Sequence, residues 1–154
     1  MSNVTNVLKM IKEKEVKFVD LRFTDSKGKW QHTAQTSSTI DESTFKDGIM
    51  FDGSSIAGWK NINESDMILM PDPKTAVMDP FTAQPQLILF CDVIEPSDGK
   101  PYELDPRSTG KKAEEYLRES GIGEKCFFGP EAEFFIFDDV KWSTDQEYTF
   151  FSID

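Results

Sequence analysis

Two glutamates within the segment GPEAEFF, residues 129–135, have a type and spacing that could do chemistry. On an extended strand, residues two apart point to the same face, so Glu131 and Glu133 would project side by side. Carboxylates held that close repel each other unless one takes a proton, a basic partner arrives or a divalent cation binds. Mg²⁺ and Mn²⁺ prefer such oxygen ligands. The spacing alone leaves open the alternative that both carboxylates lie in water at the end of a strand.

A second candidate is the glycine- and serine-rich loop FDGSSIAGW, residues 51–59. Asp52 supplies a negative charge, and Ser54 and Ser55 supply hydroxyls. The loop is acidic and lacks the Gly-Lys-Ser/Thr ending of a phosphate-binding P-loop, so a small cation pocket fits it better. A solvent-exposed turn between strands is the open alternative. Trp59 is expected to pack onto other residues, because a large aromatic side chain in a loop seldom stays free.

The composition narrows the classes of protein to which the chain can belong. Its 154 residues carry 28 acidic and 17 basic side chains, a net charge of −11, which argues against nucleic acid or an anionic membrane as the main partner. With 38% hydrophobic residues and 13 Phe, wholesale disorder is excluded. The densest apolar run, residues 87–91, is too short to span a bilayer, and we expect no secretory signal.

The histidine and the cysteines suggest structural roles. His32 is the single histidine, in a segment typical of a half-buried strand, so a histidine-based metal site is not expected. Cys91 and Cys126 lie among apolar residues and form no C-x-x-C pair. They predict two reduced core thiols in a cytosolic protein.

Helices and strands must position these candidates. Apolar residues at i, i+3, i+4 and i+7 predict a helix near residues 4–11, and residues 16–23 and 30–36 predict a β-hairpin. A short helix over 41–47 and strands at 67–70 and 87–93 complete a helix packed on a mixed sheet. The acidic residues Glu64, Asp66 and Asp92 are interpreted as turn and edge residues.

The chain changes character after this sheet. Residues 95–106 form a proline- and glycine-rich linker, followed by a helix over 107–120 with Asp105 as its cap and Pro106 at its start. Residues 126–137 predict the most hydrophobic strand, and residues 146–153 predict another.

Several motifs along the chain resemble those of a known family and occur in the same order. The segments VKFVDLRFTD (16–25), FDGSSI (51–56), NESDM (63–67), PDP (71–73) and GPEAEFF (129–135) are similar to those of bacterial type I glutamine synthetase. The resemblance covers nearly the whole chain. It implies an α+β fold, with a β-grasp N-terminal domain over 1–103 and the first helix and strands of the catalytic domain over 104–154. Family members are several-fold longer, so the chain is expected to be their N-terminal portion.

The resemblance also implies an activity and residue roles. The family ligates ammonia to L-glutamate with ATP, through γ-glutamyl phosphate, in cytoplasmic dodecamers of two stacked hexameric rings. Glu131 and Glu133 match ligands of two Mg²⁺ or Mn²⁺ ions, one in each site. Asp52 and Ser55 match the ammonium site, in which they act on the neighbouring subunit, and Trp59 matches a tryptophan at that subunit junction. Ala132 stands where close relatives carry proline, a change that preserves the strand alternation.

Two other functions stay open alongside this one: a stand-alone β-grasp interaction module without catalysis, and a weak divalent-cation binder. The 154-residue chain by itself is expected to form no glutamine, because most of the family's ligands lie further along. It is also expected to self-associate through unpaired strand edges and exposed apolar side chains.

Overall fold

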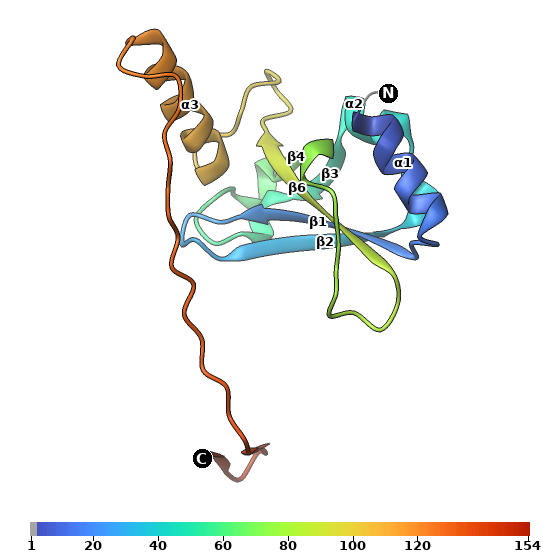
Figure 1. The fold of residues 1–154 in the computed structure, drawn as a ribbon, viewed down its shortest axis with the longest axis vertical. Coiled ribbons are helices and arrows are strands. Elements are labelled where there is room, and N and C mark those ends of the chain that lie inside the picture. The colour runs from blue at the N-terminus through green and yellow to red at the C-terminus, as the bar shows by residue number, and fades with distance from the viewer. Residues whose placement is uncertain (1–2) are drawn as a thin grey trace. The chain divides into compact units, whose positions relative to one another are not determined.

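A computed structural model describes residues 3–154, which divide into two compact units (Figure 1). The first unit ends at Glu124 and the second is Lys125–Asp154. The first contains the helices and the large sheet, and the second contains an extended segment and a hairpin. No helix of residues 3–154 is long and apolar enough to cross a membrane.

A six-stranded mixed sheet forms the first unit. Its strands run in the order β2-β1-β6-β4-β3, with β5 paired to β6. The central pair β1–β6 is parallel, and the other pairs are antiparallel. The strands are β1 Phe18–Thr24, β2 Trp30–Thr36, β3 Ile49–Asp52, β4 Asp66–Pro71, β5 Val77–Met78 and β6 Gln86–Ile94.

The β1–β2 hairpin confirms its prediction and shows how its turn is held. Asp25 accepts hydrogen bonds from the backbone N–H groups of Lys27 and Lys29, both at 2.9 Å, and from the Gln31 side chain. Gly28 adopts a φ of 82°, which glycine tolerates without steric cost. The turn thereby fixes the register that pairs Phe18 with Thr36.

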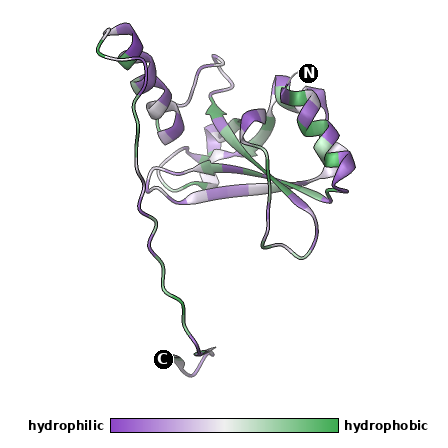
Figure 2. Cartoon of the chain, viewed as in Figure 1, coloured by the Kyte–Doolittle hydropathy of each residue, from purple (hydrophilic) through white to green (hydrophobic). Residues whose placement is uncertain are grey.

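Within residues 3–154, three α-helices accompany the sheet: α1 Asn3–Glu13, α2 Glu42–Asp47 and α3 Pro106–Glu119. Val7 and Ile11 of α1 are buried in the core, as their spacing predicts, and Leu8 and Met10 pack against it. Figure 2 shows hydrophobic and hydrophilic residues alternating along this helix. α2 begins at a capping box formed by Asp41 and Thr44. It ends at Gly48, whose φ is 75°.

The core lies on one face of the sheet, where alternate residues of β1 and β6 point inward. It contains Val19, Leu21, Phe23, Met67, Leu69, Leu87, Leu89, Cys91 and Val93. Burial raises the pKa of the Cys91 thiol, so this cysteine is the core thiol that the sequence predicts. For Cys126 that prediction is wrong, because its side chain is exposed.

Helix α3 packs with the sheet through charged residues. Asp105 is fully buried and accepts hydrogen bonds from Ser108 and from the backbone N–H of Val93. Arg107 bridges Asp72 and Asp92, at 2.5 and 2.8 Å. Asp92 lies on β6, a central strand of the sheet. The prediction that Asp92 is a turn or edge residue is therefore wrong. The compact unit extends through α3, whereas the boundary near residue 103 stays a prediction about the family's domains.

The second unit departs most from the sequence-based expectation. The predicted strand over 146–153 is present as β8 Thr149–Ile153, paired with β7 Val140–Thr144. The strand predicted over 126–137 is wrong: this segment is extended but unpaired. The backbone N–H and C=O groups of a β-strand form hydrogen bonds with a neighbouring strand, and no strand within residues 3–154 pairs with this segment. Figure 2 shows hydrophobic residues along this segment. Phe127, Phe128, Phe134 and Phe135 are largely exposed, and Phe137 is 42% exposed.

Candidate functional site

The first candidate site lies where β3 ends beside the first residue of β4. Asp52 is the last residue of β3, and its cross-strand partner is Asp66, the first residue of β4. Both residues are exposed. Like charges directly opposite each other in an antiparallel pair repel, and a cation between or beside them relieves that repulsion. This end of the β3–β4 pair is therefore suited to a small cation.

The carboxylate of Asp52 is held by Ser54. Its Oδ1 accepts a hydrogen bond from the Ser54 backbone N–H at 2.8 Å and another from the Ser54 hydroxyl at 2.6 Å. The Ser54 hydroxyl is the largest cause that lowers the pKa of Asp52, followed by the Ser54 N–H and assisted by the Ser65 hydroxyl. Hydrogen bonds to the charged form favour ionisation. Asp52 is therefore ionised at neutral pH.

A close backbone approach fixes the turn that carries Asp52 and Ser55. The Gly53 N–H donates to the Ser65 carbonyl at 2.7 Å. A Cβ at Gly53 would lie 2.5 Å from the Met67 sulfur and 3.1 Å from the Ser65 oxygen, so a larger residue does not fit without a shift. Ser55 ends this turn and is exposed. The structure thus presents Asp52 and Ser55 together at the surface.

Trp59 anchors the far end of the loop. It is 7% exposed, and its ring lies 5.5 Å from Phe23 and 5.1 Å from Tyr102. Its Nε1 donates to the Ser26 hydroxyl at 3.0 Å, and its carbonyl accepts from the Tyr102 hydroxyl at 2.8 Å. The predicted packing of Trp59 is confirmed. Its place at a subunit junction stays a prediction.

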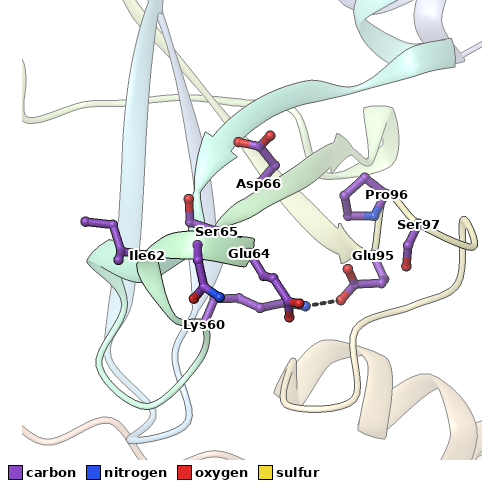
Figure 3. A pocket seen from close by; sticks show the side chains of 9 residues that line it. Lys60, Ile62, Glu64, Ser65, Asp66, Glu95, Pro96 and Ser97 are labelled. Atoms are coloured by element: carbon purple, nitrogen blue, oxygen red, sulfur yellow. Dashed lines mark hydrogen bonds and ion pairs between the residues drawn. The ribbon is translucent and has the colours of Figure 1, made fainter.

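A pocket of about 630 Å³ adjoins Asp66 (Figure 3). It is lined by Lys60, Ile62, Asn63, Glu64, Ser65, Asp66, Glu95, Pro96 and Ser97. Lys60 Nζ lies 2.5 Å from Glu95 Oε2, and this hydrogen bond raises the pKa of Lys60. Because that pair is neutral overall, the remaining carboxylates of Glu64 and Asp66 leave the pocket negative.

Glu131 and Glu133 belong to the second unit, where both are exposed. They lie two residues apart in a segment that forms no strand. Their oxygens are the ligand type that Mg²⁺ prefers. Residues 3–154, however, contain no group of three or more acidic, histidine or cysteine side chains that could hold a metal ion. The two glutamates therefore fit part of a metal-ligand set and do not complete one.

His32 lies on β2, at the opposite edge of the sheet from β3. Its Nδ1 is 2.7 Å from Oδ1 of Asp20, a carboxylate that is almost fully buried. Asp20 also accepts from Arg22 Nε at 2.7 Å. His32 thus helps to satisfy a buried charge, the structural role that the sequence indicates.

Comparison with known families accounts for nearly the whole chain. Residues 15–96 match the family described as "Glutamine synthetase, beta-Grasp domain". Residues 103–154 match "Glutamine synthetase, catalytic domain". The predicted α+β fold, with a β-grasp domain followed by the start of a catalytic domain, is confirmed by these matches.

Individual relatives agree with the family match. The glutamine synthetase of Rhizobium meliloti is 60% identical over all 154 residues, which cover 33% of that protein. A 3-hydroxylaminophenol mutase of Cupriavidus pinatubonensis is 56% identical over 151 residues, 32% of its length. Glutamine synthetase from Plasmodium falciparum has a similar structure, with a TM-score of 0.73 at 25% identity over 99% of this chain and 30% of that one. The chain spans about a third of the length of these relatives.

Proposed function

The chain belongs to the glutamine synthetase family, and we propose on that basis that it supplies the N-terminal part of an enzyme that ligates ammonia to L-glutamate with ATP. The observation that carries this proposal is the exposed, ionised Asp52 beside Ser55, at the end of the β3–β4 pair where Asp66 adds a second charge. Such a site attracts a small cation and rejects a phosphate.

Asp52 would bind the ammonium ion and accept its proton as ammonia attacks the activated glutamate. A carboxylate performs both tasks when it is ionised at the working pH and within hydrogen-bond reach of the proton. The Ser55 hydroxyl offers a second oxygen acceptor to the same ion. As the family resemblance implies, both residues would act in the active site of the neighbouring subunit.

Glu131 and Glu133 would hold Mg²⁺ or Mn²⁺, one glutamate in each of two sites, with the remaining ligands supplied from outside residues 3–154. Bound there, the metals would offset the phosphate charge of ATP, the substrate that activates glutamate. The spacing of the two glutamates, two residues apart in one segment, supports this assignment, because such residues share a face when the backbone is extended.

The same family membership suggests the assembly and location. We propose a cytoplasmic dodecamer of two hexameric rings, with Trp59 near the junction between subunits and the family's domain boundary near residue 103. Because Trp59 is buried in its own subunit, it would shape the junction by holding the loop 51–59 in place. A net charge of −11 favours neither nucleic acid nor a membrane as a partner.

The test is an assay of the full-length product of the gene that encodes this chain. We expect glutamine to form when glutamate, ammonium, ATP and Mg²⁺ are all present. We also expect Glu131→Gln and Glu133→Gln to weaken the dependence on metal, and Glu147→Gln, an exposed residue of the same unit, to leave it unchanged. Conversion of 3-hydroxylaminophenol without glutamine formation would overturn the proposal, since one relative carries the mutase name.

A stand-alone interaction module is the second candidate. The first compact unit favours it, because its sheet and helices enclose a core of their own. Such a module would bind a full-length synthetase and leave its own Asp52 without a catalytic task. Glutamine formation that is lost on Asp52→Asn substitution in the gene's product would exclude it.

A further inference from the structure

The arrangement of Asp52 and Ser54 occurs a second time in this chain. Asp41 Oδ1 accepts hydrogen bonds from the Ser43 backbone N–H at 2.8 Å and from the Ser43 hydroxyl at 2.5 Å. The corresponding distances at Asp52 and Ser54 are 2.8 and 2.6 Å. In both pairs the serine hydroxyl is the largest cause of the lowered aspartate pKa. The two pairs are locally alike but differ in surroundings: Asp41 caps helix α2, whereas Asp52 faces Asp66 at the candidate site.

We propose that Ser54 is a positioning residue, whose hydroxyl orients the Asp52 carboxylate for the ammonium site. This inference rests on the proposed function of Asp52 and adds a residue to it. The family resemblance on which that function rests names Asp52 and Ser55. Ser54 follows from the hydrogen bonds alone.

The hydroxyl does more than the turn requires. The backbone N–H of Ser54 already caps the short turn Gly53–Ser55 through Asp52 Oδ1, and that bond survives in any residue except proline. The hydroxyl adds a second bond to the same oxygen, and its donor lies on a half-buried side chain. Two donors on one oxygen restrict rotation of the carboxylate about its Cβ–Cγ bond. They also stabilise its charge, because hydrogen bonds to a carboxylate favour the ionised form.

The contacts of the preceding residue, Gly53, fix the position of Ser54. Gly53 is buried against Met67, and its N–H donates to Ser65, whose hydroxyl also lowers the pKa of Asp52. The contacts therefore run from the buried Met67 of β4, through Gly53 and the turn, to the Asp52 carboxylate. A site built this way is preorganised, so it loses little entropy when a cation binds.

The experiment compares Ser54→Ala, Ser54→Thr and Ser43→Ala in the full-length product of the gene, with ammonium as the varied substrate. We expect Ser54→Ala to raise the KM for ammonium roughly three- to tenfold, the effect of one net hydrogen bond. The KM values for glutamate and ATP should stay near those of the wild type. Ser54→Thr keeps the hydroxyl and should restore the KM for ammonium, and Ser43→Ala should leave it unchanged.

A carboxyl-carbon NMR titration of the 154-residue chain gives an independent readout. Ser54→Ala should raise the pKa of Asp52 and leave that of Asp41 in place, and Ser43→Ala should do the reverse. A wild-type KM for ammonium in Ser54→Ala, an equal rise in Ser43→Ala, or no recovery in Ser54→Thr would each overturn the inference.

The two proposals fail separately. If Asp52→Asn leaves ammonium kinetics unchanged, the function proposed for Asp52 is wrong, and the ammonium role of Ser54 is wrong with it. If Asp52→Asn impairs ammonium use but Ser54→Ala alters neither that use nor the Asp52 titration, the function stands and Ser54 has no positioning role.

Discussion

At the scale of single residues, small polar side chains control where charge lies at the end of β3 and β4. Asp52 and Asp66 face each other across the pair, and Ser54 donates two hydrogen bonds to one of the two carboxylates. Glycine is required between Asp52 and Ser54, because Met67 and the Ser65 carbonyl occupy the space of a Cβ. The chemistry of the loop thus depends on packing beneath it.

Gly53→Ala tests that packing. The added methyl group must displace the fully buried Met67 side chain, which overpacks the core, so we expect a loss of roughly 1–3 kcal/mol in the free energy of unfolding. Gly110→Ala is the matched control: it lies on exposed α3 with no atom near its Cβ position. It should be neutral or stabilising by up to about 1 kcal/mol. Urea denaturation of both variants measures the difference, and equal stabilities would contradict the packing argument.

Asp41 links stability to pH. Its pKa lies below the ordinary value of 3.8 in the folded chain because Ser43 and the Thr44 N–H donate to it. Its contribution to stability is therefore present above about pH 4 and is lost as the pH falls through the lower, folded-state value. Asp41→Asn keeps a capping oxygen but does not titrate. We expect this variant to lose less stability than the wild type between about pH 5 and pH 2, measured by denaturation at each pH; parallel losses would refute the link.

Sequence patterns identify some of these residues and not others. The motif FDGSSI singles out Asp52 and Ser55, because an acidic glycine-rich loop has few chemical uses. Asp66 is interpreted from the sequence as a turn residue, because the neighbouring residues do not indicate that it pairs with Asp52 of β3. Cross-strand register depends on pairing across a long loop, and the periodicity of each strand is compatible with more than one register.

At the scale of elements, α3 is attached to the sheet by its first turn. The buried Asp105 caps the helix and bonds to β6, and Arg107 reaches Asp72 and Asp92. Capping and the starting proline are visible in the sequence, and the predicted helix is confirmed. The attachment to β6 is not visible, because it joins residues that only the fold brings together.

Asp105→Ala tests the attachment. It removes the cap and leaves the Ser108 hydroxyl and the Val93 N–H without their acceptor in a buried site. We expect a loss of roughly 2–4 kcal/mol in unfolding free energy. Glu114→Ala, on the exposed face of the same helix, breaks its 3.3 Å pair with Arg118 and should cost no more than about 0.5 kcal/mol. A thermal melt in which the two variants coincide would show that α3 is not held through Asp105.

The segment 126–137 shows the limit of periodicity at this scale. Its apolar residues predict a strand, and the structure has no strand there. The hydrophobic pattern of a segment indicates which of its side chains favour burial. Whether the segment pairs as a β-strand depends on the other strands that lie beside it. Cys126 is predicted as buried and found exposed for the same reason.

At the scale of the whole molecule, the chain combines a unit that has its own core with a unit whose apolar residues are mostly exposed. Phe127 and Phe128 are 90% and 86% exposed, and Phe135 is 87% exposed. Apolar surface of this extent is unusual for a monomer and favours association. The net charge of −11 opposes that association only in part.

Analytical ultracentrifugation and limited proteolysis test this division. We expect the 154-residue chain to self-associate as its concentration rises, and a protease to cut first within residues 125–139, leaving a folded product of residues 1–124. That product should sediment as a monomer. A full chain that stays monomeric over a wide concentration range, or first cuts inside the sheet, would contradict the two-unit description.

The central claim, that Asp52 binds the ammonium ion for glutamine formation, is tested most directly by steady-state kinetics of Asp52→Asn in the full-length product of the gene. Asparagine keeps the size of the side chain and its capping oxygen and removes the charge. We predict a fall in kcat/KM for ammonium of about a hundredfold or more, the range for a general base. The KM values for glutamate and ATP should change little. An Asp52→Asn enzyme with wild-type kcat/KM for ammonium would contradict the claim.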